Sequence, residues 1–408
     1  MQKLGDVVMY KEINNFKLIV GKTNLDSKPL VSFNSLACNF LNELSRELIK
    51  DKTAKKFSDI ISFAFWCRNS NIKILKEKFY DNNLRVGLGL VFHITPSNVP
   101  VNFAFSFAFG LLTGNANLVK LPTQNFPQID IICKKVNLVF KKKKFKKLKE
   151  MNCFLKYESK NSNLTKEFSQ LADCRMIWGG DQTIKEVKKF ETKNKIIDMS
   201  FGDKYSFCVI DSKSINKISD KKMNLLAERF YNDTYSMDQN ACSSPRLVVW
   251  LGSKSSTVKA KKKFWLKLYN YAKIKYKLDE INAIDKYEQL CSDAIDLQNI
   301  DKINLNKNLL HRITLNKLPI TLNKLKGKFG YFYEFNTLDI NSCKKIINSN
   351  FQTLTYYGVN KEILSNFVTS NRLSGIDRIV PIGMALDIGF LWDGYNLDKS
   401  LTRVIEIK

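Results

Sequence analysis

Short apolar segments bounded by turn residues alternate with longer segments of helical periodicity along this chain. In this pattern residues 85–94 form one apolar strand, residues 102–112 a helix, and residues 117–121 a second strand that Pro122 ends. A strand, a helix and a strand within about 35 residues predict a βαβ unit, and such units build parallel sheets.

The alternation continues through the middle of the chain, after a first region (residues 1–80) that is predicted to be mainly helical and to supply packing faces. Further strands are predicted at 173–178, 206–211, 247–251, 329–335 and 353–358, and further helices at 128–139, 183–190, 220–233 and over much of 252–298. A chain of 408 residues exceeds one hydrophobic core, so we expect an α/β protein of two or more domains.

Composition places the chain among globular proteins, with 44% hydrophobic residues. Residues Met1–Tyr10 lack the basic-then-apolar pattern of a secretory signal. The most apolar stretch, Val99–Leu112, is too short to span a membrane and contains Asn102 and Ser106. We therefore expect a cytoplasmic protein without a membrane span.

The cysteine and histidine content limits the chemistry. Nine cysteines are scattered without a Cys-x-x-Cys pair, which predicts neither a zinc site nor a dithiol redox site. An odd number of cysteines without a signal peptide also argues against a disulfide framework. Two histidines, His93 and His311, leave a catalytic cysteine few imidazole partners, and no metal site is predicted.

The formal net charge of +27 is concentrated in two clusters, Lys141–Lys147 and Lys259–Lys263. Binding to nucleic acid or to an acidic membrane surface is one interpretation, and a solvated lysine-rich surface is the other. No nucleic-acid-binding motif accompanies the clusters, so we expect no nucleic-acid function. The charge favours anionic ligands such as nucleotides, CoA or an acidic carrier protein.

Cys242 is the candidate for covalent chemistry. It lies among small and polar residues in Ser236–Arg246, directly before the buried strand at 247–251. A thiol displayed at that point, with room around it, is a plausible nucleophile. A small, inert core cysteine is the alternative, because cysteines are often buried.

Two pairs of glycines are candidates for a phosphate-binding loop. Gly179–Gly180 follows the strand at 173–178 and precedes a helix, an arrangement that suits a phosphate but equally a plain turn. Gly87 and Gly89 lack a third glycine and fall inside the predicted strand at 85–94, so they are not a dinucleotide fingerprint.

Six segments in one order resemble the aldehyde dehydrogenase superfamily, and within it the acyl-CoA reductases of the bioluminescence fatty-acid reductase (LuxC) family. The likeness covers about residues 85–408 and is carried by His93–Pro100, Gly110–Asn117, Asp238–Arg246, Phe351–Leu354, Arg378–Gly383 and Trp392–Gly394. The resemblance implies a fold like that of aldehyde dehydrogenases, with a modified Rossmann cofactor domain and an α/β catalytic domain.

Site residues follow from the resemblance position by position. It implies that Cys242 is the nucleophile and that the Asn98 amide helps to form an oxyanion hole, although Asn98 between two prolines is also an ordinary turn residue. Lys120 matches the lysine at the adenosine end of the cofactor, with an exposed strand-end lysine as the alternative. The cofactor-binding residues implied in this way are Thr95, Pro96, Lys120, Gly179 and Gly180.

Two departures from the superfamily pattern are informative. Hydrolytic aldehyde dehydrogenases carry a glutamate that activates water, and the matching stretch here, residues 200–204, begins with Ser200. Loss of that base fits transfer of the acyl group to or from a thiol rather than hydrolysis. The ribose-binding glutamate of the superfamily also has no clear counterpart near Phe329–Gly330.

The resemblance thus predicts NADPH-dependent reduction of an acyl thioester to an aldehyde. The expected domains are 1–204 with the dinucleotide-binding domain, 205–375 with the nucleophile, and 376–408, a segment that packs back on the cofactor domain or forms a subunit interface. Expected partners are acyl-CoA or an acyl-carrying protein, and a homo-oligomer is expected. An aldehyde dehydrogenase working in the oxidative direction and a non-catalytic basic binding protein remain as alternatives.

Overall fold

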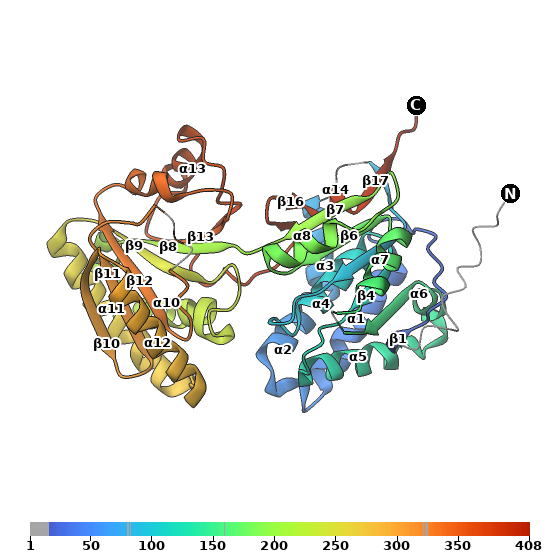
Figure 1. Cartoon of the computed structure of the whole chain (residues 1–408), viewed down its shortest axis with the longest axis horizontal. Coiled ribbons are helices and arrows are strands. Elements are labelled where there is room, and N and C mark those ends of the chain that lie inside the picture. Colours follow the sequence, from blue (N-terminus) through green and yellow to red (C-terminus); the bar gives the residue numbers. More distant parts are fainter. Residues whose placement is uncertain (1–15, 80, 82, 159, 321, 323–324) are drawn as a thin grey trace. The chain divides into compact units, whose positions relative to one another are not determined.

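The computed structural model describes residues 16–408 except 80, 82, 159, 321 and 323–324 (Figure 1). Met1–Tyr10, which is predicted to be no secretory signal, lies outside these residues. The chain forms two compact units: unit 1 contains residues up to Gly202 together with Ile388–Lys408, and unit 2 contains Asp203–Asp387. Each unit is built on its own sheet, and each is described by itself.

The main sheet of unit 1 has the order β1-β5-β4-β3-β6-β7 within the described residues, and all its neighbouring strands are parallel except β1 and β5. Strands β3, β4 and β6 are buried along their whole length, as expected for parallel strands with both faces covered. The strands of this sheet are β1 Lys17–Gly21, β3 Leu90–Ile94, β4 Ala116–Lys120, β5 Asn152–Lys156, β6 Cys174–Trp178 and β7 Ile197–Phe201.

Helices connect these strands and pack on the sheet (Figure 1). The expectation of a mainly helical first region is met by α1 to α3, but β1 also belongs to it. The helices of unit 1 are α1 Ser35–Lys50, α2 Ser58–Trp66, α3 Asn69–Phe79, α4 Asn102–Leu112, α5 Pro127–Phe140, α6 Lys146–Glu150, α7 Ser162–Leu171, α8 Asp181–Lys188 and α14 Leu397–Ser400.

The single strand predicted over residues 85–94 is wrong. The chain forms β2 (Leu84–Gly87) and then β3, which belong to different sheets. Gly89 breaks the strand with φ +135°, and a Cβ there would lie 2.2 Å from a carboxylate oxygen of Asp173. That carboxylate accepts the Leu90 N–H at 2.8 Å, so it occupies the place that a side chain would need. Gly89 therefore redirects the chain from one sheet into the other.

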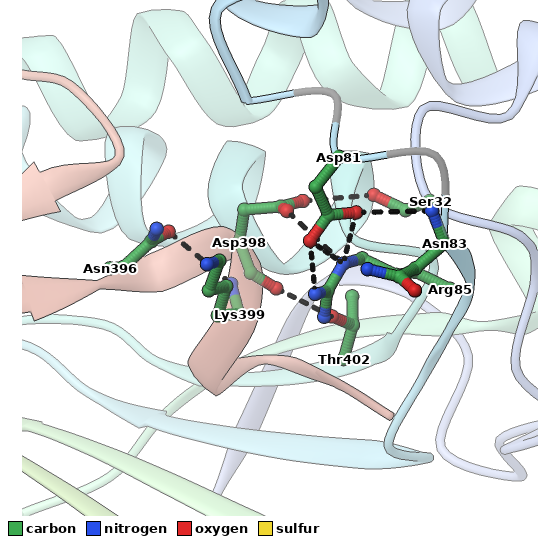
Figure 2. Close-up of polar contacts among 8 residues, drawn as sticks. All are labelled: Ser32, Asp81, Asn83, Arg85, Asn396, Asp398, Lys399 and Thr402. Atoms are coloured by element: carbon green, nitrogen blue, oxygen red, sulfur yellow. Dashed lines mark hydrogen bonds and ion pairs between the residues drawn. The ribbon is translucent and has the colours of Figure 1, made fainter. Parts of the chain in front are cut away.

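The C-terminal segment returns to unit 1 and pairs with β2. Strand β17 (Thr402–Ile405) runs antiparallel to β2, and β15 (Leu391–Trp392) pairs with β16 (Tyr395–Asn396). Figure 2 shows the polar contacts at this junction: Arg85 binds the Asp81 carboxylate and donates to Thr402 Oγ1 at 3.3 Å, while Ser32 donates to Asp398 at 3.1 Å. The Arg85–Thr402 and Ser32–Asp398 bonds join segments more than 300 residues apart in sequence.

Unit 2 contains a sheet of order β10-β11-β12-β9-β8-β13-β14 within the described residues, parallel except for the β10–β11 pair. Its strands are β8 Tyr205–Asp211, β9 Pro245–Leu251, β10 Ile300–Asn306, β11 Leu310–Leu315, β12 Tyr331–Thr337, β13 Phe351–Tyr357 and β14 Arg378–Pro381. Its helices are α9 Ser212–Lys217, α10 Asp220–Thr234, α11 Lys254–Lys275, α12 Glu280–Asp296 and α13 Lys361–Ser370. Both units are thus α/β structures with largely parallel sheets.

Helix α12 packs with polar side chains on its buried face. Lys286 and Asp293 are 2% and 3% exposed, whereas Ile281 and Ile295 on the same helix are 64% and 82% exposed. Asp293 accepts hydrogen bonds from two tyrosine hydroxyls of β12 at 2.6 Å each. Lys286 Nζ donates to the carbonyl oxygens of Asn308 at 2.8 Å and Phe329 at 2.9 Å. Hydrogen bonds therefore attach α12 to β12 and to the backbone at Asn308 and Phe329. Sequence periodicity alone does not predict these bonds.

Burial makes Lys286 a source of pH-dependent stability. It lowers the pKa of Lys286 from 10.5 to about 7. Between these values the unfolded chain binds more protons than the folded chain, so the free energy of unfolding rises with pH. The contribution of neutral Lys286 to the free energy of unfolding is complete above pH 10.5. It declines as the pH falls and is lost below about pH 7. We expect urea unfolding of Lys286→Met to depend less on pH between 7 and 10 than that of wild type.

The exposed Lys275 at the end of α11 provides the control for this measurement. Lys275→Met should keep the wild-type pH dependence, because it removes a lysine that is not buried. Equal slopes for wild type and a folded Lys286→Met would contradict the lowered pKa.

The two basic clusters are partly used within the fold. Lys142 and Lys144 both bind the Glu43 carboxylate, while the adjacent Phe145 is fully buried. In the second cluster, Lys261 lies 3.2 Å from the buried Glu334 carboxylate. Part of each cluster is therefore structural. Across the described part of the chain, no helix is both long and apolar enough to cross a membrane.

Candidate functional site

The predicted cofactor residues of unit 1 gather at one edge of its main sheet. The strand order β5-β4-β3-β6-β7 places β3, the first strand of the βαβ unit, in the middle of the sheet. Ligands of such sheets bind beyond the carboxyl ends of the strands. Thr95 follows the carboxyl end of β3, Lys120 ends β4, and Gly179–Gly180 follow β6. The sheet thus brings together residues that are up to 85 positions apart.

Lys120 is not the exposed strand-end lysine of the alternative interpretation. It is 8% exposed, and its Nζ lies 5.1 Å from the centre of the Tyr157 ring. Burial lowers its pKa, and the nearby Glu158 carboxylate opposes this effect. Thr95 Oγ1 donates to the Lys120 carbonyl oxygen at 2.6 Å, which ties the ends of β3 and β4 together. A buried cation at this edge is suited to an anionic ligand.

The sequence analysis predicted no strand at residues 152–156, so it missed β5 and the residues at its carboxyl end. Its last residue, Lys156, is followed by the buried Tyr157, and Lys156 Nζ donates to Asn125 Oδ1 at 2.5 Å. Leu155 pairs with Lys120 in the parallel ladder, so Lys156 and Tyr157 extend from the same edge. The strand pattern at residues 152–156 was the available signal, but it was not assigned to a strand.

The Gly179–Gly180 pair leads directly into α8, with Gly180 as the N-terminal capping position. A Cβ on Gly179 would lie 3.3 Å from Thr183, so a side chain there would be tightly packed. The helix end supplies backbone N–H groups for an anion. Its first turn also carries Asp181, which places a negative charge at the same end.

Asn98 lies in the exposed loop after β3, and Pro96 in the same loop is half-buried. This loop joins β3 to α4, the helix of the βαβ unit. Asn98 therefore shares the carboxyl edge of the sheet with Thr95 and Lys120, and its side chain is solvent-accessible.

Cys242 is exposed and lies in unit 2, before the amino end of β9. Buried groups fix its backbone: Ser206 Oγ donates to the Cys242 carbonyl oxygen at 2.7 Å and accepts the Thr353 N–H at 3.1 Å. Arg378 Nη1 donates to Thr353 Oγ1 at 3.5 Å. The segments 351–354 and 378–383, which carried part of the resemblance, are therefore linked to the cysteine by hydrogen bonds.

Arg246, the last residue of the cysteine motif, is 9% exposed. Its guanidinium donates to the carbonyl oxygens of Lys204 at 3.4 Å and Gln239 at 3.2 Å. The motif thus anchors its own loop on both sides of Cys242, so the thiol is exposed on a backbone that is firmly held.

The other thiols and the histidines have different surroundings. Cys208 is fully buried, and burial raises its pKa. Burial also lowers the pKa of His93 and of His311 to about 4, so both are neutral at pH 7. His93 is held between Ser106 at 2.7 Å and Asn117 at 2.9 Å, inside unit 1. Cys291 on α12 is a second exposed thiol.

Ser200 lies on β7, at the same carboxyl edge of the unit 1 sheet as Gly179. It is half-buried, and its N–H donates to the Tyr395 hydroxyl at 3.4 Å. Its own hydroxyl oxygen has no hydrogen-bond partner among the described residues. Position 200 thus carries a small, buried hydroxyl group and no carboxylate.

Comparisons with known proteins agree with this architecture. The family model described as "Acyl-CoA reductase (LuxC)" matches residues 71–404. No curated protein matches the chain significantly.

Solved structures share the fold at low identity. Aldehyde dehydrogenase 21 from Physcomitrella patens, in complex with succinate, has 9% identity and a TM-score of 0.63, covering 91% of this chain and 85% of its own. A glyceraldehyde-3-phosphate dehydrogenase from Methanocaldococcus jannaschii, complexed with NADP, has 14% identity and a TM-score of 0.60, covering 91% and 88%. An NAD-dependent benzaldehyde dehydrogenase from Corynebacterium glutamicum has 12% identity and a TM-score of 0.59, covering 92% and 85%. At these identities they show the aldehyde dehydrogenase fold alone.

Proposed function

Because the chain belongs to the LuxC acyl-CoA reductase family, an oxidoreductase family with the aldehyde dehydrogenase fold, we propose that it reduces an acyl thioester to an aldehyde with NADPH. The observation that carries the proposal is Cys242, an exposed thiol on a loop whose backbone is held by buried side chains. The acyl donor is acyl-CoA or an acyl group on a partner protein, and the enzyme works as a cytoplasmic homo-oligomer.

Cys242 is the nucleophile in this proposal. Its thiolate attacks the carbonyl carbon of the acyl thioester, the donor thiol leaves with the electron pair of its C–S bond, and the acyl group remains on Cys242. NADPH, when bound, supplies the hydride that reduces this acyl group to a thiohemiacetal. Collapse of the thiohemiacetal releases the aldehyde and regenerates the Cys242 thiolate. Covalent catalysis of this kind divides one difficult step into easier ones.

The residues at the carboxyl edge of the unit 1 sheet fit a dinucleotide. The buried ammonium of Lys120 would hold the adenosine end, with Thr95 and Pro96 beside it. The backbone N–H groups at Gly179–Gly180 would hold the pyrophosphate, although Asp181 weakens this end of the site. The Asn98 amide would serve as a donor to the oxyanion, and loss of one such donor typically costs about 100- to 1,000-fold in rate.

Purified protein with NADPH and a panel of acyl-CoAs tests the proposal. We expect absorbance at the NADPH band to fall only when an acyl-CoA is present, with an aldehyde as the product. Oxidation of aldehydes with CoA and NADP⁺, without measurable reduction of any acyl-CoA, would instead identify a CoA-acylating aldehyde dehydrogenase. The absence of any reaction in either direction would contradict the proposal.

Lys120→Ala should weaken NADPH binding more than it slows hydride transfer at saturating NADPH. Binding energy that is equal in the ground state and the transition state raises KM without lowering kcat when it is removed. Fluorescence titration gives the affinity and single-turnover kinetics gives the rate. Lys189→Ala, which removes an exposed lysine after α8, should leave both unchanged. An unaltered NADPH affinity in Lys120→Ala would remove this lysine from the cofactor site.

A further inference from the structure

The loop between α10 and β9, residues 235–244 and here called the nucleophile loop, contains two successive residues in the left-handed region. Asp238 has φ 54° and Gln239 has φ 55°. Glycine adopts this region readily, whereas a residue such as glutamine does so only where the surroundings impose it. The conformation of the loop three residues before Cys242 therefore needs an external cause.

The hydrogen bonds of the Gln239 side chain supply such a cause. It is fully buried, and its Oε1 accepts the N–H groups of Gly330 at 2.7 Å and Tyr331 at 3.1 Å. Its Nε2 donates to the carbonyl oxygens of Tyr331 at 3.2 Å and Pro245 at 3.3 Å. The amide thus uses its full hydrogen-bonding capacity, two donors and two acceptor sites.

These bonds enclose Cys242 on both sides. The link from Gln239 to Pro245 connects the loop residue three positions before the cysteine to the residue three positions after it. The links to Gly330 and Tyr331 fasten the same point to the start of β12, more than 90 residues away. Cys242 therefore lies in the middle of a segment whose two ends are tied together and tied to the sheet.

The partner turn at Phe329–Gly330 is equally constrained. Both residues have positive φ, 58° and 80°, and Phe329 N–H donates to the Asp238 carbonyl oxygen at 3.2 Å. A Cβ on Gly330 would lie 2.5 Å from the Tyr235 ring, so the turn packs directly on the nucleophile loop. Lys286 holds the turn from α12 through the Phe329 carbonyl oxygen.

We propose that Gln239 is a positioning residue for the Cys242 nucleophile, and that it acts by locking the nucleophile loop to the Phe329–Gly330 turn. The proposal rests on the function proposed above, because positioning matters only if Cys242 reacts. Gln239 touches neither substrate nor cofactor in this role. It holds Asp238 and Gln239 in the left-handed conformation that presents the thiol.

Two substitutions separate positioning from packing. Gln239→Ala removes the amide and leaves a side chain that disfavours positive φ, whereas Gln239→Gly removes the amide but permits that backbone. We expect kcat/KM for acyl-CoA to fall about 10- to 100-fold in Gln239→Ala, the scale of effect that small displacements of reacting groups produce. Gln239→Gly should be at least about 5-fold more active than Gln239→Ala, because it avoids the cost of a left-handed side-chain residue.

The matched control is Asn216→Ala. The Asn216 amide donates to the Ser256 carbonyl oxygen at 3.0 Å and joins α9 to α11, so its loss removes a comparable bridge elsewhere in unit 2. This variant should keep wild-type kcat/KM. All variants are compared at a temperature at which circular dichroism shows them folded.

A second readout does not depend on the reductase activity. Iodoacetamide labelling followed by peptide mass spectrometry gives the alkylation rate of Cys242 relative to the exposed Cys291 in the same sample. We expect this ratio to fall in Gln239→Ala, because the thiol is then presented for only part of the time, and to recover toward wild type in Gln239→Gly. Asn216→Ala should leave it unchanged.

The outcomes distinguish this inference from the proposed function. A wild-type protein that reduces no acyl-CoA, but whose Cys242 labelling responds to the Gln239 substitutions as expected, would overturn the function and keep the positioning role. A folded Gln239→Ala with wild-type labelling would overturn the positioning role. So would an Asn216→Ala that loses as much as Gln239→Ala in both readouts, since the loss of any bridge in unit 2 would then explain the effect.

Discussion

Replacing Cys242 by alanine is expected to abolish both acylation of the protein and NADPH-dependent aldehyde formation. Radiolabelled acyl-CoA should leave a hydroxylamine-sensitive label on wild type and none on Cys242→Ala, because the acyl group has lost the sulfur to which it binds. Cys242→Ser should be nearly inactive as well. Both described imidazoles, His93 and His311, are largely buried, so neither is evident as a base to activate a hydroxyl.

Cys291→Ala is the matched control, since Cys291 is the other exposed thiol of unit 2. It should be labelled and active like wild type. Equal labelling of wild type and Cys242→Ala would refute the assignment of the nucleophile, and loss of label in Cys291→Ala alone would transfer the role to α12.

The second large effect is a gain of hydrolysis in Ser200→Glu. Without a base at position 200, the acyl group on Cys242 should persist in water until NADPH or a thiol discharges it. A glutamate there would restore the carboxylate that activates water in hydrolytic relatives, and a well-placed general base contributes about 100- to 10,000-fold. The measurement is CoA release from acyl-CoA in the absence of NADPH, for wild type and variant.

Ser200→Gln controls for the size of the new side chain, because it has nearly the same shape and cannot act as a base. It should release CoA no faster than wild type. Rapid multiple-turnover hydrolysis by the wild type would contradict the reductase proposal. An unchanged rate in a folded Ser200→Glu would show that this β7 residue does not face the acyl group.

The sequence determined much of the local structure and the chemical candidates. Apolar runs bounded by turn residues predicted β4, β6, β8 and β9 with errors of one or two residues, and helical periodicity predicted α4, α5 and α10. These signals are local, because strand and helix periodicity depends on which faces are buried. The motif around Cys242 and the order of the six segments were sufficient to identify the family.

Tertiary structure alone decided how these elements are used. The sequence around Gly89 continues as an apolar run, and only the Asp173 carboxylate, more than 80 residues away, explains the break between β2 and β3. Burial of Lys120 beside Tyr157 likewise depends on which strand lies next to β4. A periodicity pattern cannot show such partners, because each is distant in sequence.

The same limit applies to the nucleophile loop. Its sequence displays a thiol among small residues, but the left-handed pair at Asp238–Gln239 is held by the turn before β12. The amide of Gln239 binds Gly330 of that turn, Tyr331 at the start of β12, and Pro245. Residue types thus determined which groups are available for chemistry. Hydrogen bonds between segments distant in the chain determined where those groups point, because a buried polar group must find its partner wherever the fold places one.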